Sequence, residues 1–171
     1  MDTLLASRTW HWRATDWAAA AVAGFAAGAL LMVLDLVWSA LFNPHGPWRV
    51  SHMIAPIFIG ADTLKATGSV YAFDASVVAI ALGTHYLLGV LFGLVVGVVL
   101  AQLRLDQRAD RAAATGAILG MALYVLNFDI LLVFFPWLAE LQGLATLSAH
   151  VVFGTVAGVL YWRLKRTGAG D

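Results

Sequence analysis

A few polar side chains that could do chemistry lie inside long apolar stretches of this 171-residue sequence. They are Asp35, His85, Asn127, Asp129 and His150. An ionisable group inside a membrane costs several kcal/mol unless it is paired or hydrated, so each is a candidate functional residue. Imidazole and carboxyl groups in such surroundings could bind a polar ligand or relay protons.

The same histidines allow a second kind of chemistry. Neutral imidazole is the commonest metal ligand, so His85 and His150, with His52 and Asp35, could form a metal site. Alternatively, His85 and His150 could bind one haem axially from two helices. The sequence carries no diagnostic ligand spacing such as His-Glu-x-x-His, so the cofactor stays unknown.

The elements that must position these residues are apolar runs long enough to cross a bilayer. They cover residues 17–42, 75–103, 112–135 and 144–162. Backbone groups in lipid are satisfied only in helices and closed barrels, and the runs lack the alternation of barrel strands. The sequence therefore predicts an all-α protein with four transmembrane helices.

Composition agrees with a membrane protein of one domain over residues 1–171. Hydrophobic residues make up 61% of the chain and charged residues 12%. The formal net charge is zero, which gives no basis for binding nucleic acid. There is no cysteine, so disulfides, thiolate metal sites and cysteine nucleophiles are excluded.

Basic residues predict the orientation. Eight of them flank one set of helix ends: Arg8, Arg13, Arg104, Arg108, Arg111, Arg163, Lys165 and Arg166. The opposite loops carry Arg49 and Lys65. By the positive-inside rule both termini are cytoplasmic. The long outer loop contains an apolar segment, residues 47–60, that is too short to span and reads as an interfacial helix.

The chain also contains two copies of one hairpin pattern. Each copy reads Gly-x3-Gly-x6-Asp/Asn, then a proline-containing turn, then His-x3-Gly-x3-Gly. The matching residues are Gly24, Gly28 and Asp35 with Gly116, Gly120 and Asn127, and His85, Gly89 and Gly93 with His150, Gly154 and Gly158. Both copies start on the same side, so we expect two parallel-repeat hairpins, over residues 17–103 and 112–164, with glycines packing the helices.

The repeat also predicts where the polar residues meet. At about 1.5 Å per helical residue, Asp35, His85, Asn127 and His150 all lie in the outer half of the membrane. We expect them to converge between the hairpins as one polar cluster. Asp129 follows Asn127 by two residues and so points to another helix face.

Several stretches resemble a known group of proteins. PWRVSHMIAPIFIG, LNFDILLVFFPWL and SAHVVFGTVAGVLYWRL resemble small four-helix bacterial inner-membrane proteins labelled sodium:proline symporter-like, and more distantly the YagU-like family. The resemblance covers residues 17–164. It implies a multi-pass protein of the bacterial inner membrane, and it brings no substrate or catalytic residues.

Three functions fit these patterns. The first is a small transporter-like or channel-like protein, which with only four helices would be a homo-oligomer. The second is a metal- or haem-binding protein, and the third is a non-catalytic accessory or assembly subunit of a larger membrane complex. The sequence shows no nucleophile elbow and no phosphate-binding loop, so we expect no enzymatic activity.

Overall fold

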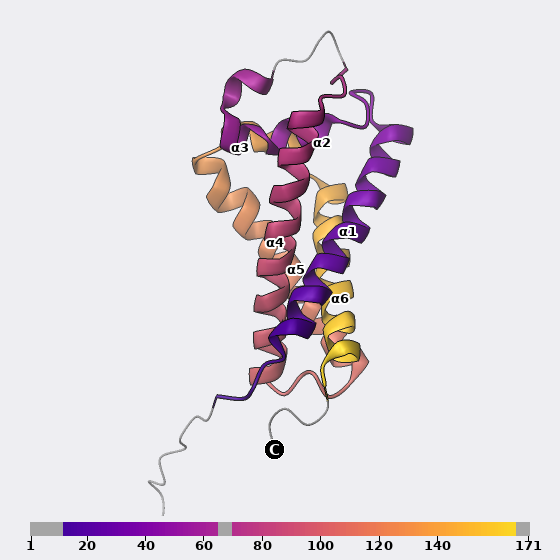
Figure 1. Ribbon diagram of the computed structural model, residues 1–171, viewed down its shortest axis with the longest axis vertical. Coiled ribbons are helices and arrows are strands. Elements are labelled where there is room, and N and C mark those ends of the chain that lie inside the picture. Colours follow the sequence, from indigo (N-terminus) through magenta and orange to yellow (C-terminus); the bar gives the residue numbers. More distant parts are fainter. Residues whose placement is uncertain (1–11, 65–69, 167–171) are drawn as a thin grey trace, which may run out of the picture.

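The computed structural model describes residues 12–64 and 70–166 and is an all-α membrane protein (Figure 1). Within these residues, four helices are long and apolar enough to cross a bilayer, as predicted. They are α1 (Trp17–Phe42), α4 (Ala75–Gln102), α5 (Ala109–Val125) with its non-α continuation to Val133, and α6 (Leu144–Leu164). Arg8 and Lys65, which entered the orientation argument, lie outside the described residues.

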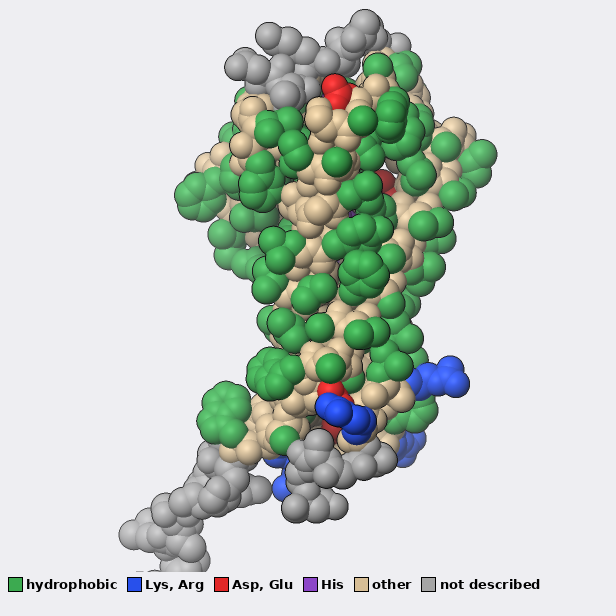
Figure 2. Space-filling model, in the orientation of Figure 1, with side chains coloured by type: hydrophobic (Ala, Val, Ile, Leu, Met, Phe, Trp, Pro, Cys, Tyr) green, Lys and Arg blue, Asp and Glu red, His purple; other side chains and the backbone are tan. Residues whose placement is uncertain are grey.

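The two ends of the bundle differ. At one end, here called the terminal end, α1 begins, α6 finishes and a short loop joins α4 to α5 (Figure 1). At the other, the capped end, lie the short helices α2 (Arg49–Ile54), α3 (Pro56–Ile59), η1 (Ala61–Leu64) and η4 (Pro136–Leu141). Figure 2 shows apolar side chains over the visible face between the two ends, with lysine and arginine gathered at the terminal end.

The short helix predicted over residues 47–60 is present as two pieces, α2 and α3. Pro56 begins the second piece, where it has no backbone N–H to continue the hydrogen-bond ladder of α2. Gly60 ends α3 with a φ of +91°, a backbone conformation that glycine adopts without a steric penalty.

The third apolar run departs from the prediction of one regular helix over residues 112–135. The α-helical part begins earlier, at Ala109, and ends at Val125. It continues as a π-helix, η2 (Leu126–Ile130), and then as a 3₁₀-helix, η3 (Leu131–Val133). Within the π segment, the Phe128 carbonyl accepts a hydrogen bond from Gln142 Nε2 at 3.2 Å. Such π segments frequently mark functional sites.

Backbone contact at glycines holds α1 against α4. A Cβ atom built on Gly24 would overlap the Gly89 carbonyl oxygen and lie 2.7 Å from the Gly93 Cα. A Cβ on Gly93 would lie 2.6 Å from the Ala20 carbonyl oxygen. Such close approach supplies the packing that helices need where lipid provides no hydrophobic drive.

The helices α5 and α6 make the corresponding contacts. A Cβ on Gly116 would overlap the Gly154 carbonyl oxygen, and one on Gly120 would overlap the His150 carbonyl oxygen. The repeat predicted from the sequence aligns the contact of Gly116 with Gly154 and that of Gly24 with Gly89. Glycine contacts with the neighbouring backbone thus occur in both pairs of helices.

Two ion pairs join the chain segments at the terminal end. Asp16 caps α1 by accepting from Ala19 N at 3.1 Å, and its other oxygen accepts from Arg166 Nε at 3.0 Å. The Arg166 side chain first, and then the Ala19 amide, hold the pKa of Asp16 at about 2, below the ordinary 3.8. Beside it, Lys165 pairs with the buried Asp106 of the α4–α5 loop.

The glycine contacts lead to a stability prediction. Gly24→Ala should lower the free energy of unfolding by about 1–3 kcal/mol, because the added methyl overlaps backbone atoms that cannot move aside independently. Gly83 in α4 is the matched control, since a Cβ there meets nothing within 4 Å. Gly83→Ala should change stability by less than about 1 kcal/mol, and favourably, through helix propensity. Unfolding in mixed micelles, followed by far-UV circular dichroism, measures both; equal effects would contradict the glycine contact.

Candidate functional site

His150 is fixed in one tautomer by two hydrogen bonds. Its Nδ1 lies 2.7 Å from the carbonyl oxygen of Thr146, one turn earlier in α6. Its Nε2 lies 3.0 Å from Nδ2 of Asn127 on the neighbouring π-helix. A carbonyl can only accept and an amide nitrogen can only donate, so Nδ1 carries the proton and Nε2 accepts. Both ring nitrogens are thereby satisfied while the ring is uncharged.

The π-helix and its aromatic neighbours surround this histidine. Asn127 is the second residue of η2, where α5 has just lost its regular geometry. The rings of Tyr124 and Phe128 stand nearly edge-on to the His150 ring, with centroids 5.6 and 6.1 Å away. The Tyr124 hydroxyl also accepts from Gly143 N at 3.2 Å, which ties the end of α5 to the start of α6.

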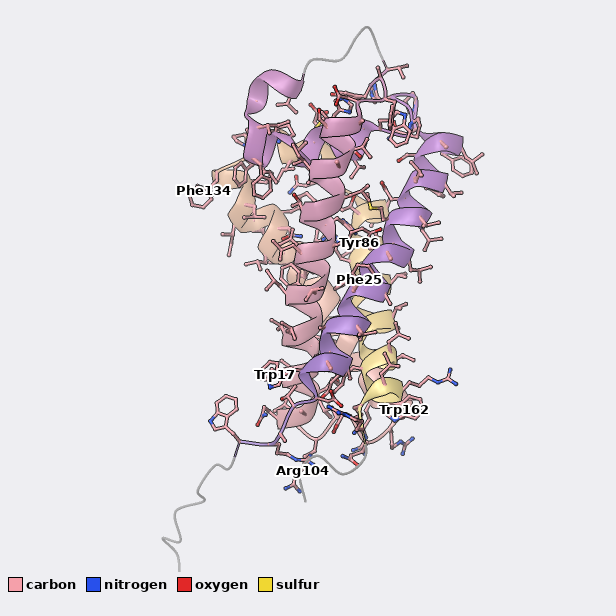
Figure 3. The ribbon with its side chains drawn as sticks, in the orientation of Figure 1. Trp17, Phe25, Tyr86, Arg104, Phe134 and Trp162 are labelled. Atoms are coloured by element: carbon pink, nitrogen blue, oxygen red, sulfur yellow. The ribbon has the colours of Figure 1, made fainter. Side chains whose placement is uncertain are left out.

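His85 makes the corresponding contact in the other hairpin, but to the backbone. Its Nε2 lies 3.2 Å from the carbonyl oxygen of Gly28 on α1. The carbonyl accepts, so Nε2 donates, and Nδ1 of the uncharged ring has no hydrogen-bond partner in the described chain. The next residue, Tyr86, packs on Phe25 with ring centroids 4.9 Å apart (Figure 3).

Asp35 lies on the side of α1 that faces the bundle. It follows Gly28 by seven residues, which is two turns along the same helix face and about 10 Å farther toward the capped end. Ser39, one further turn along, is buried, whereas Val33 and Leu34 are exposed. Asp35 is half-buried and makes no hydrogen bond or ion pair with any residue that the structure describes. Figure 2 shows an acidic side chain recessed between α1 and α4 toward the capped end.

The two remaining candidates are Asp129 and His52. Asp129 is exposed on η2 and has no polar partner among the described residues. His52 is buried in α2, where its Nδ1 lies 3.0 Å from the Trp48 carbonyl oxygen and its ring centroid lies 5.0 Å from that of Tyr71.

The described residues contain no group of three or more histidine, cysteine, aspartate or glutamate side chains that could hold a metal ion. The set of His52, His85 and His150 suggested by the sequence is thus not brought together. Axial haem ligation by His85 and His150 is also disfavoured, because the Nε2 atom of each is already engaged in an interhelical hydrogen bond.

The residues that orient the histidines and those that cover them were not predicted from the sequence. The Thr146 carbonyl orients His150. The only sequence feature that indicates this bond is the four-residue spacing between the two residues. At the capped end Trp137 Nε1 donates to the Met53 carbonyl at 3.0 Å, and Arg49 Nη2 donates to Glu140 Oε2 at 3.2 Å. These bonds join the first and second loops of that end, and no local pattern pairs residues so far apart in the chain.

Comparison of the chain with protein-family models, with curated proteins and with solved structures gives no match in any of the three.

The hydrogen bonds predict two different histidine tautomers. In ¹⁵N NMR spectra of histidine-labelled protein at neutral pH, His150 should be protonated at Nδ1 and His85 at Nε2, because each proton faces a carbonyl oxygen. Asn127→Leu removes the donor to His150 Nε2, so the resonance of that nitrogen alone should shift, with His85 as the internal control. Finding the same tautomer for both rings would contradict the arrangement.

Proposed function

We propose that this protein is a small proton-handling transporter or channel whose working site is the polar cluster of Asp35, His85, Asn127 and His150. The cluster draws on all four membrane-crossing segments, and each histidine connects two of them. Titratable groups between membrane helices are the components from which proton relays are built. The proposal is for movement across the membrane and not for an enzymatic reaction.

The observation that carries this proposal is the unpartnered carboxyl group of Asp35. The hydrogen bonds of His85 and His150 connect helices, so structural stabilisation alone would account for them. Structural stabilisation does not explain Asp35, because its carboxyl group makes no hydrogen bond or ion pair within the described chain. A half-buried, unpaired acid inside a membrane is costly, and such groups mark ion or substrate pathways.

The location we propose is the bacterial inner membrane, with the terminal end in the cytoplasm. The excess of arginine and lysine at that end supports this orientation, as does the resemblance noted above to bacterial inner-membrane proteins. Trp17, Trp162 and Arg104 all lie toward the terminal end, as expected where helices leave the lipid (Figure 3).

The orientation can be tested with single cysteines, because the chain has none of its own. Gln107→Cys lies in the α4–α5 loop and Ala61→Cys lies in η1, and both positions are exposed. A membrane-impermeant maleimide added to intact bacterial spheroplasts should label Ala61→Cys, and should label Gln107→Cys after lysis only. The reverse pattern would invert the topology.

The function is tested by proton flux into proteoliposomes that contain a pH-sensitive dye. An imposed pH gradient, with valinomycin and potassium to compensate charge, should collapse faster with the wild-type protein than in protein-free liposomes. Asp35→Asn should return the rate to the protein-free level, because the amide cannot carry a proton. The variant should keep its helix content and elute as the wild type does.

Asp110→Asn provides the matched control. Asp110 is an exposed acid that pairs with Arg108 at the terminal end, outside the polar cluster. This variant should conduct as the wild type does. If Asp35→Asn conducts equally well, or if the wild type never exceeds protein-free liposomes, the proposed function is wrong.

A further inference from the structure

An apolar cavity of about 280 Å³ lies between α4 and α5, with α6 behind it. Phe92 and Val96 line it from α4, Leu123 from α5, and Phe153 and Gly154 from α6. Three other lining residues are exposed on the flank of the bundle, namely Val95, Ala122 and Leu126. The cavity therefore opens sideways, toward the region that hydrocarbon occupies in a membrane.

The predicted repeat shows that this cavity is a departure from the packing elsewhere. Under the repeat, the contact of α4 with α5 corresponds to that of α6 with α1. The contact of α6 with α1 is extensive and closely packed, and Ala27, Ala157 and Tyr161 are buried there at 0–2% exposure. By contrast, α4 and α5 barely touch. Of these two corresponding interfaces, the one between α6 and α1 is packed and the one between α4 and α5 is open.

The polar cluster lies directly beyond this opening, toward the capped end. His150 precedes the lining residue Gly154 by one helical turn, and Asn127 follows the lining residue Leu123 by about one turn. His85 precedes Phe92 by two turns on the same face of α4. An elongated molecule in the cavity would thus have its outer end beside these three side chains.

The apolar lining of the cavity is unsuited to bound water. A buried water needs two to four polar partners, and the lining residues offer apolar side chains. A dry cavity of about 150 Å³ is already large enough to hold a benzene molecule. Hydrocarbon is therefore the chemistry that fits this space.

The free polar atoms above the cavity are acceptors. With Nε2 donating to Gly28, Nδ1 of uncharged His85 has a free lone pair. Asn127 gives its Nδ2 to His150, while its Oδ1 has no partner in the part of the chain described. The carboxyl of Asp35 adds further acceptor oxygens toward the capped end. A matching ligand must supply N–H or O–H donors.

We infer that the protein binds an amphipathic molecule whose hydrocarbon tail fills the α4–α5 cavity and whose hydrogen-bond-donating head group contacts the polar cluster. This inference rests on the proposed function, because it gives the class of ligand that the same cluster takes. The ligand enters sideways from the membrane, and the exposed lining residues mark its route.

The test is photolabelling of the full-length protein in phosphatidylcholine nanodiscs, with a decylamine derivative that carries a diazirine on its tail. Mass spectrometry of the digested protein should place the label on the parts of α4 and α5 that line the cavity. Ala122→Phe and Val95→Phe, which fill the opening from opposite walls, should each abolish this labelling. Ala40→Phe, at an exposed position of α1 away from the cavity, should leave it unchanged.

Competition experiments distinguish binding of the head group from binding of the tail. Unlabelled decylamine and decanol should displace the probe, whereas decanoate, whose carboxylate has no donor to give, should displace it poorly. Asn127→Leu should weaken this discrimination, because one of the three acceptors is lost. Equal displacement by all three compounds in the wild type would overturn the head-group assignment. Labelling spread evenly over the lipid-facing helices and insensitive to Ala122→Phe would mean ordinary boundary lipid, and would overturn the site.

The two proposals fail in distinguishable ways. Specific labelling of the cavity in a protein that conducts no protons would leave the binding site standing and remove the transport function. Proton flux that depends on Asp35, in a protein whose cavity takes no label, would do the opposite.

Discussion

Close approach of backbones at glycine residues is the interaction on which the rest of this structure depends. Lipid is as apolar as the helix surfaces, so burying apolar side chains drives helix association far less than it does in water. Without side chains at Gly24, Gly93, Gly116 and Gly154, the helices of each hairpin meet main chain to main chain. Any larger residue at these points would separate each pair of helices.

The interhelical hydrogen bonds follow from this closeness. In the first hairpin, the contact of Gly24 with the backbone of Gly89 and Gly93 brings α1 near enough to α4 for His85 to reach the Gly28 carbonyl. In the second hairpin, the contact of Gly120 with the His150 backbone brings α5 near enough for Asn127 to reach the ring. Tight packing and polar pairing are therefore two aspects of one contact in each hairpin.

The sequence predicted the four spans and their bounds well, because an apolar run of bilayer length has few alternatives. It also predicted the short helix of the first loop, although not its division at Pro56. The π-helix at Leu126–Ile130 was not predicted, because the hydrogen bond that accompanies it comes from Gln142, fourteen residues away, and no local pattern pairs the two. The hydrogen bond between Asn127 and His150 joins two of the candidate residues. The lack of a partner for Asp35 depends on which side chains fail to reach it, which the sequence does not show.

The ion pairs at the terminal end carry a consequence for how the protein is made. Asp16 stands before the first helix, and its partner Arg166 follows the last. During synthesis the early helices enter the membrane while Arg166 has yet to be translated. The pair of Asp16 with Arg166 therefore cannot form until α6 has been translated, and a chain truncated before Arg166 lacks it.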